Sequence, residues 1–361
     1  MNNIVKNNKI RIKHITYVLI SLSFIIQSCS NGSSPIQPQP PKDPRTYTWT
    51  ADTLYLVGNA QTLMRRIWGS SPKDVYAVGW ADRNGPMWHY DGNKWTFVKL
   101  NPLDGGLVSG FIGLWSIYGF SANDIYAVGQ NSDHSSAMIH FDGSNWKRVS
   151  LPSVGGLLTS IYGTSSNSVW AGGVNTLYHF NGTKWQRDSV LVSIPLNSFF
   201  QFTSFAKYNT GLYAVGFTII NNGLSENHYF FKQINSNFSA IDSAINTARS
   251  DYGLVLWGSP EGNLYGGDIG ISKYNGSTWT NILQANNPII DIYGTSDNNI
   301  FVTGNRVVYH YNGKDWKDIT GKLSNNRTSL YTGVWTNGTE AFIVEQPLTG
   351  WPQKTVIWHG K

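Results

Sequence analysis

Short runs of β-branched and aromatic residues, separated by polar turns, recur along this chain in one fixed order. The clearest copy occupies residues 67–95 and contains Ile-Trp-Gly-Ser, Asp74-Val-Tyr-Ala-Val-Gly79, Trp88-His-Tyr-Asp-Gly92 and finally Trp95. Such runs favour β-strands, and an Asp-Gly or Asn-Gly pair favours a tight turn between two of them. Each copy therefore predicts four strands, of which the first ends in Ile-Trp-Gly and the last opens at the closing Trp.

Seven copies of this pattern follow one another, beginning near residues 67, 117, 161, 204, 256, 292 and 334. A repeat of about 40–50 residues built from short strands is typical of a radial or stacked array. One small sheet cannot bury both of its faces, whereas sheets packed face to face around an axis can. The 15 Trp residues and the 14% aromatic content supply bulk for that packing. The pattern predicts an all-β fold, a seven-bladed β-propeller of four-stranded antiparallel blades.

The last copy lacks a fourth strand, because the sequence ends at His359-Gly360-Lys361, where the other copies make their turn. A candidate strand lies at the other end, in residues 46–54, and Trp49 matches the closing Trp of the other copies. We predict that this N-terminal strand completes the last blade, since such closure removes free sheet edges. The propeller then occupies residues 45–361.

The first residues have the pattern of an export signal. Four basic residues precede an apolar stretch of twelve residues, 15–26, which is too short to span a bilayer. The stretch ends at Ile26-Gln-Ser-Cys29, which resembles the lipobox of bacterial lipoproteins. That resemblance implies a signal peptide at residues 1–28, lipid on Cys29 and an outer-membrane anchor. Residues 29–44 are rich in Ser and Pro and suit an extended tether. A chance cysteine beside a cleaved signal is the alternative.

Removing the signal changes the charge of the chain. Four of the 27 Lys+Arg residues and none of the 21 Asp+Glu residues precede Cys29, so the net charge falls from +6 to +2. No dense basic run remains, and we expect no nucleic-acid partner. Cys29 is the only cysteine, which excludes an internal disulfide. We expect a monomer without a cofactor.

Four histidines occupy the same place in four repeats, namely His89, His140, His179 and His310. Equivalent positions on different blades are spread around a ring, whereas a zinc site needs its nitrogen ligands within about 2.0–2.1 Å of the metal. We therefore predict no metal site, and expect each histidine to make a structural hydrogen bond beside the turn.

The Val-Gly ending of the second strand, the Tyr-Asp-Gly turn and the following Trp resemble kelch-type repeats. Two copies also have the paired glycines of that family, Gly172-Gly173 and Gly266-Gly267, while the others match in part. The frame resembles uncharacterised bacterial secreted propellers as well, and more loosely the seven-bladed bacterial lectins. The resemblance covers about residues 46–361 and implies the propeller fold. It implies little about function, because propellers host many activities.

The connections between strands differ in variability. The turns joining strands one to two and three to four hardly vary, whereas the strand two-to-three loops and the segments joining blades vary greatly. In an up-and-down blade the two variable connections lie on the same face, which we term the variable-loop face. Loops held by a rigid scaffold commonly carry binding residues, although they can also be tolerated insertions. The best candidates there are Trp80, Asp82, Arg83, His134 and Trp351.

Two further candidates lie in the innermost strands. Arg66 and Asp291 stand where three other repeats have Ser116, Ser160 and Ser204. We expect Arg66 and Asp291 to line the mouth of the central channel or to form a solvated pair.

Three functions fit these features. The first is a lipid-anchored, non-enzymatic envelope module that binds glycan or protein through the variable-loop face. The second is a polysaccharide-acting enzyme with acidic residues on the same face, and the third is a structural platform of an envelope complex. Three or more acids at the channel mouth would favour the enzyme, an aromatic shelf would favour binding, and a broad apolar patch would favour the platform.

Overall fold

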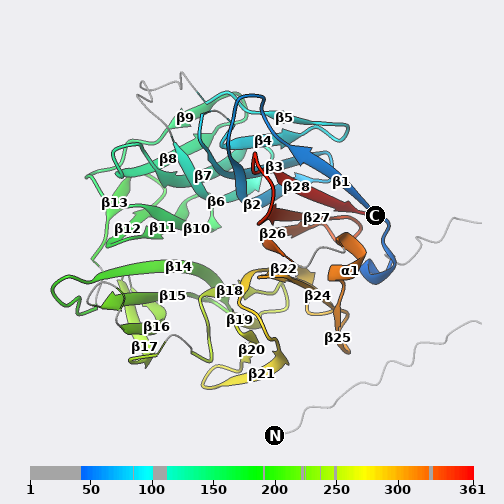
Figure 1. Cartoon of the computed structure of the whole chain (residues 1–361). Coiled ribbons are helices and arrows are strands. Elements are labelled where there is room, and N and C mark those ends of the chain that lie inside the picture. The colour runs from blue at the N-terminus through cyan, green and yellow to red at the C-terminus, as the bar shows by residue number, and fades with distance from the viewer. Residues whose placement is uncertain are drawn as a thin grey trace, which may run out of the picture. The chain divides into compact units, whose positions relative to one another are not determined.

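The structure is a computed structural model that describes residues 42–83, 85–100, 112–189, 192–220, 223, 225–235, 237–247, 250–324 and 328–361. Seven four-stranded antiparallel sheets are arranged in a ring (Figure 1). The predicted fold, a seven-bladed β-propeller, is confirmed. Among the described residues, no helix is both long and apolar enough to cross a membrane.

The blades follow one another along the chain, each with its first strand innermost. Blades 1 and 2 consist of β2 (Thr62–Ser71), β3 (Asp74–Ala81), β4 (Met87–Tyr90), β5 (Trp95–Phe97), β6 (Gly113–Ser121), β7 (Asp124–Gln130), β8 (Ser136–Phe141) and β9 (Trp146–Arg148). Blades 3 and 4 consist of β10 (Leu158–Ser165), β11 (Ser168–Gly173), β12 (Thr176–Phe180), β13 (Trp185–Arg187), β14 (Phe199–Tyr208), β15 (Gly211–Ile220), β16 (Ser225–Ile234) and β17 (Asn237–Ala244). The fourth repeat thus forms a four-stranded antiparallel blade like the others.

The remaining blades complete the ring. Blades 5 and 6 consist of β18 (Val255–Gly258), β19 (Leu264–Asp268), β20 (Gly270–Tyr274), β21 (Trp279–Gln284), β22 (Ile289–Ser296), β23 (Asn299–Gly304), β24 (Val307–Tyr311) and β25 (Trp316–Asp318). Blade 7 consists of β26 (Ser329–Thr336), β27 (Ala341–Pro347), β28 (Thr355–Gly360) and β1 (Trp49–Leu54). Two short helical turns, η1 (Pro44–Thr46) and α1 (Thr320–Leu323), lie outside the sheets.

The N-terminal strand closes the ring, as predicted. β1 runs antiparallel to β28 with Trp49 opposite Gly360 and Leu54 opposite Thr355. Thr48 and Lys361 add two backbone hydrogen bonds, of 3.0 and 3.2 Å, beyond the end of this ladder. The first and last strands of the domain therefore lie side by side (Figure 1).

A glycine at the end of the second strand shapes the innermost strand of most blades. A Cβ added to Gly79 would lie 2.1 Å from the Leu63 carbonyl oxygen, and one added to Gly129 would lie 1.8 Å from that of Gly113. Opposite these glycines the ladder shifts register, and the same shift occurs in six of the seven blades. A β-bulge of this kind inserts one unpaired residue and re-aims side chains. As a result, consecutive residues such as Arg65 and Arg66 both line the channel.

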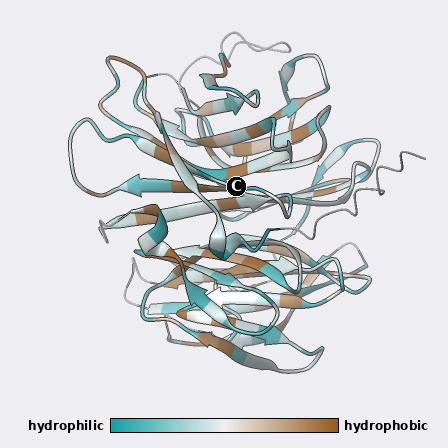
Figure 2. Ribbon diagram, turned by 90° about the vertical axis from the view of Figure 1, so that its right-hand side faces the viewer, coloured by the Kyte–Doolittle hydropathy of each residue, from teal (hydrophilic) through white to brown (hydrophobic). Residues whose placement is uncertain are grey.

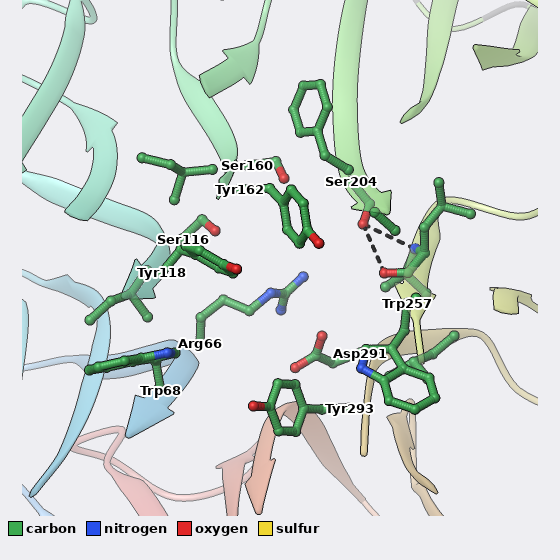
Figure 3. Close-up of a pocket in the computed structure, with 18 of the residues that line it drawn as sticks. Arg66, Trp68, Ser116, Tyr118, Ser160, Tyr162, Ser204, Trp257, Asp291 and Tyr293 are labelled. Atoms are coloured by element: carbon green, nitrogen blue, oxygen red, sulfur yellow. Dashed lines mark hydrogen bonds between the residues drawn. The ribbon is translucent and has the colours of Figure 1, made fainter. Parts of the chain in front are cut away.

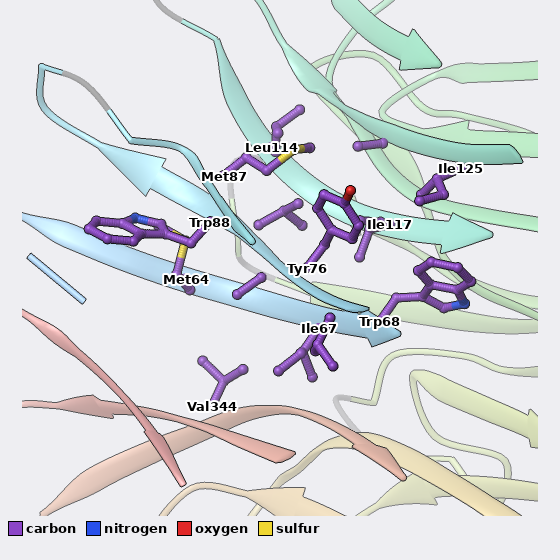
Figure 4. Close-up of a cluster of buried hydrophobic side chains, with 14 of the residues drawn as sticks. Met64, Ile67, Trp68, Tyr76, Met87, Trp88, Leu114, Ile117, Ile125 and Val344 are labelled. Atoms are coloured by element: carbon purple, nitrogen blue, oxygen red, sulfur yellow. The ribbon is translucent and has the colours of Figure 1, made fainter. Parts of the chain in front are cut away.

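Aromatic and aliphatic side chains fill the space between neighbouring blades (Figure 4). Met64, Ile67 and Trp68 of blade 1 share one cluster with Ile117 of blade 2 and Val344 of blade 7. Hydrophobic residues accordingly concentrate on the strands (Figure 2). A glycine leaves room for the largest of these side chains, since a Cβ on Gly119 would lie 2.4 Å from the Trp68 ring.

The turns between strands differ in detail from the expected ones. The first and second strands of blade 1, β2 and β3, are separated by only two residues. In the Asp91-Gly92 turn only Gly92 has a positive φ, of 91°. The carboxylate of Asp91 accepts hydrogen bonds from the amides of Asn93 and Lys94, at 2.8 and 2.9 Å, which makes this a four-residue turn closed by its own side chain.

Replacement of Gly129 by Ala tests the glycine–carbonyl contact. The new Cβ would overlap the Gly113 carbonyl, so we expect the free energy of unfolding to fall by about 2–4 kcal/mol. Gly321→Ala is the matched control, because a Cβ there meets nothing within 4 Å. Chemical denaturation followed by circular dichroism measures both variants. Equal stability of Gly129→Ala and Gly321→Ala would show that the contact does not constrain the blade.

Candidate functional site

The repeated histidines belong to the architecture of the blades. His89 stacks on Tyr76 with ring centroids 4.3 Å apart, and its Nε2 lies 2.7 Å from Asp74 Oδ1. His140 repeats this arrangement, and His310 lies 2.9 Å from Asn299 Oδ1. The expected hydrogen bond is thus present at these three positions. His179 instead stacks on Trp170 at 3.8 Å, and its buried Nδ1 has no hydrogen-bond partner within the described ranges.

Sequence comparison of the repeats missed how far this pairing extends. His359 of blade 7 stacks on Phe342 at 4.0 Å, and its Nε2 lies 2.5 Å from Glu340 Oε2. Blades 4 and 5 have lysines instead, and the ammonium groups of Lys232 and Lys273 lie 5.8 and 5.6 Å from the centroids of Tyr213 and Tyr265. A cation over an aromatic ring replaces the stacked imidazole there. Every blade thus pairs its second and third strands through an aromatic ring.

Three of the predicted site residues, Asp82, Arg83 and Trp351, lie in the loops where blade 7 meets blade 1. Asp82 accepts hydrogen bonds from the amides of Ala60 and Gln61, both 3.0 Å long, and these bonds lower the pKa of its carboxyl. The amide of Gln353, in the β27–β28 loop, donates to the Ala60 carbonyl at 2.9 Å. Residues 55–61, which join the two blades, are therefore held by both neighbouring loops. The carboxylate of Asp82 is already occupied by this segment.

Arg83 and Trp351 project from these two loops. The Trp351 side chain is 71% exposed, and Val57 on the joining segment is 96% exposed. Arg83 lies close to the joining segment, since a Cβ added to Gly58 would lie 3.5 Å from Arg83 Nη1. Lys354 Nζ lies 4.7 Å from the centroid of the Tyr55 ring. These residues together offer an aromatic ring, apolar surface and positive charge to solvent.

The other two loop candidates lie apart from this group. Trp80 is half-buried at the seam between blades 1 and 2, where a Cβ on Gly113 would lie 3.3 Å from its Cδ1. His134 is exposed at the tip of the β7–β8 loop, and its amide donates to Asn131 within the same loop. The structure therefore brings Arg83 and Trp351 to one area and leaves His134 in the loop of the next blade.

Arg66 and Asp291 line a cavity of about 330 Å³ on the ring axis, to which the innermost strands of all seven blades contribute (Figure 3). Arg66 donates to the carbonyls of Thr332 at 2.5 Å and Ile290 at 3.3 Å. Asp291 Oδ2 accepts from the Val334 amide at 3.1 Å. Burial raises the pKa of Asp291, and the Arg66 charge acts against that rise. The two residues thus connect blades 1, 6 and 7, and both line this axial cavity, whereas Asp291 is not among the residues that line the channel mouth described below.

Other polar groups of this cavity also join neighbouring blades. Ser204 Oγ accepts from the Leu256 amide at 3.0 Å and donates to its carbonyl at 3.3 Å. The Tyr118 hydroxyl donates to the Gly163 carbonyl at 3.0 Å. Six aromatic residues line this cavity, namely Trp68, Tyr118, Tyr162, Phe205, Trp257 and Tyr293 (Figure 3). Several of the polar groups that line this cavity therefore make hydrogen bonds to neighbouring blades.

A second cavity, of about 360 Å³, forms the channel mouth on the variable-loop face. Its lining includes residues that sequence reasoning missed, above all Arg65 and Trp115, which are the bulge residues of blades 1 and 2. The Arg65 guanidinium carbon lies 3.9 Å from the Trp115 ring centroid. Among the residues lining the two cavities Asp291 is the one acid. No group of three His, Cys, Asp or Glu able to hold a metal occurs within the described part of the chain.

Comparisons with known proteins extend no further than the fold. No protein-family model matches the chain, and a search of curated proteins finds no match. The chain is similar to the extracellular domain of BT4673 from B. thetaiotaomicron, described as a one component system, with a TM-score of 0.56 and 12% identity over 85% of this chain and 40% of that chain. It therefore spans less than half the length of that protein chain.

A second solved structure, the Dos1 propeller, gives a TM-score of 0.51 and 10% identity over 83% of this chain and 93% of that chain. At these identities the likenesses show the propeller fold alone. The kelch-type character of the repeats has no support from a family model and stays a prediction.

Replacement of Arg66 by Met tests whether the axial residues join the blades. The variant leaves two inter-blade carbonyls and Asp291 without their cation, so we expect a loss of at least about 2 kcal/mol in the free energy of unfolding. Combining it with Asp291→Asn should cost less than the sum of the two single changes, because the unpaired charge is then removed. Additive effects in thermal and chemical denaturation would contradict this coupling.

Proposed function

We propose that this protein is a non-enzymatic binding module that engages a protein or glycan through the variable-loop face. The observation that carries the proposal is the distribution of exposed apolar side chains. Of the ten large hydrophobic residues exposed in the described part of the chain, seven lie in the connections of that face, namely Val57, Val154, Ile194, Leu196, Ile245, Leu348 and Trp351. Apolar side chains gathered on one face commonly mark an interaction surface.

The chemistry of these residues favours a protein partner. Six of the seven are aliphatic, and aliphatic side chains pack against apolar protein surface, whereas sugar rings are held mainly by aromatic platforms. A glycan is the second candidate, because Trp351 is exposed and Arg83 and Lys354 lie in the same group of loops. The enzyme alternative expected three or more acids at the channel, where the described lining provides one, Asp291.

Binding measurements with face-specific variants test the proposal. The purified full chain is probed with a glycan array and with soluble envelope proteins of the producing bacterium, and a Val57→Asp/Trp351→Ala variant should lose at least about tenfold in affinity. Ile234→Asp is the matched control, since Ile234 is exposed at the end of β16, beside the turn to β17 on the face of uniform turns. Equal losses in both variants would contradict a role for the variable-loop face. If neither the native chain nor the Trp80→Ala and Trp351→Ala variants bind any glycan on the array, the glycan version of the proposal is eliminated.

We further propose that the protein is held at the outer membrane of a bacterium by lipid on Cys29. The lipobox-like Ile26-Gln-Ser-Cys29 and the Ser/Pro-rich residues 29–44 support this anchor, and residues 1–41 lie outside the described residues. Labelled palmitate fed to producing cells should be incorporated into the chain and lost in a Cys29→Ser variant. Undiminished labelling of Cys29→Ser would refute the anchor. Protease treatment of intact cells then distinguishes the cell surface from the periplasmic side.

A further inference from the structure

We propose that the channel mouth on the variable-loop face binds a small organic carboxylate, with Arg65 as its anion-binding residue. This site goes beyond the surface binding described above. It uses residues of the innermost strands, and the proposed function neither requires nor supports it.

The position of Arg65 is set by the bulge in β2. The bulge turns Arg65 and Arg66 toward the same side of the strand, so both line the mouth. The guanidinium lies 3.9 Å over the ring of Trp115, the bulge residue of the next blade. Stacking on an aromatic face holds the planar guanidinium while its N–H groups, which lie in the plane, stay available for a ligand. The geometry thus orients a fork of donors at the mouth.

Arg65 has no acidic partner within the described ranges of the chain. Burial, together with the neighbouring charge of Arg66, lowers the pKa of Arg65, and its buried Nε has no hydrogen-bond partner among the described residues. A partly buried cation without a counter-charge is costly, and an anionic ligand would relieve that cost. An anion is therefore the ligand charge that the mouth favours.

Arg66 differs from Arg65 although it is adjacent in sequence. Its donors reach the carbonyls of Arg65, Thr332 and Ile290, and Asp291 supplies the opposite charge nearby. Arg66 is thus part of the framework of the ring, and the uncompensated charge at the mouth is that of Arg65.

The side chains that line the mouth indicate the chemical character of the rest of the ligand. Leu254, Ile289, Ile290 and Leu330 contribute aliphatic surface, and Phe217 contributes an aromatic ring, around the cavity of about 360 Å³. A hydrated inorganic ion would leave this apolar surface without contacts. A carboxylate pairs with a guanidinium through two parallel hydrogen bonds, and its hydrocarbon body would cover the aliphatic walls. The mouth therefore fits a small carboxylate with an apolar body.

A matched pair of probes tests the proposal on the unmodified full chain. The probes are 4-methylpentanoate and 4-methylpentanamide, which share size and shape and differ in charge, and titrations followed by ligand-observed NMR give their dissociation constants. We expect the carboxylate to bind at least about tenfold more tightly than the amide, as charge-assisted hydrogen bonds commonly provide. Equal affinity for the two probes, or no binding of the carboxylate at millimolar concentration, overturns the proposal.

Variants assign the preference to Arg65. In Arg65→Met the carboxylate should bind only as weakly as the amide, and in Arg65→Lys it should bind about three- to tenfold more weakly than in the native chain, because an ammonium lacks the planar fork. Arg187→Met is the control, an exposed arginine on the same face whose guanidinium donates to the Val154 and Asn175 carbonyls. Melting curves verify that each variant folds.

Two results would contradict the assignment in different ways. If folded Arg65→Met keeps the preference for the carboxylate, Arg65 is not the anion-binding residue. If inorganic sulfate displaces 4-methylpentanoate at equal concentration, the apolar walls do not select the ligand. The comparison of the two probes needs no variant, so it stands even if Arg65→Met fails to fold.

Discussion

The bulge of the innermost strand, which in five of the seven blades lies opposite a second-strand glycine, is the constraint that shapes the channel of this propeller. Because Gly79 and Gly129 lack a Cβ, the carbonyl groups of the innermost strand can lie closer to the second strand than any side chain would allow. The bulge that accompanies this approach changes which residues face the axis. Without it, strict alternation would turn Arg65 and Arg66 to opposite faces of β2. With it, both contribute to the axial cavities, one to hold the ring together and the other to face the mouth.

The repeated residues and the variable residues thus have separate roles. The aromatic side chain of the second strand packs against a histidine in five blades and against a lysine in two, and the closing strand β1 supplies the last edge. These contacts recur because each blade meets the same packing problem. The loops on the face opposite the uniform turns do not make these contacts, and seven of the ten exposed large hydrophobic side chains of the described residues lie in them. The division gives a rigid ring with one face free to vary.

Much of the fold could be predicted from the sequence because its signals are local and repeated. The Asp-Gly turns and closing Trp residues marked the blades, and the unmatched Trp49 identified the strand that closes the ring. The site was less accessible. Arg83, Trp351 and the axial pair Arg66 and Asp291 could be selected because they break the repeat. Arg65 and Trp115 could not, since alternation within a strand places them on the wrong face and a bulge depends on the partner strand. Asp82 was selected as a loop acid, yet its oxygens bind backbone amides of residues distant in sequence.

The proposed function requires that ligands contact the variable-loop face and not the face of uniform turns. Photo-crosslinking in the producing cells measures this directly, with a photoreactive amino acid placed at Val57 or Leu196 on the variable-loop face and at Asn93 or Ser144 in the uniform turns. All four positions are exposed, so access by solvent is comparable. We expect covalent adducts from Val57 and Leu196 and none above background from Asn93 and Ser144. Adducts that form equally from both faces, or only from the uniform turns, would contradict the proposed function.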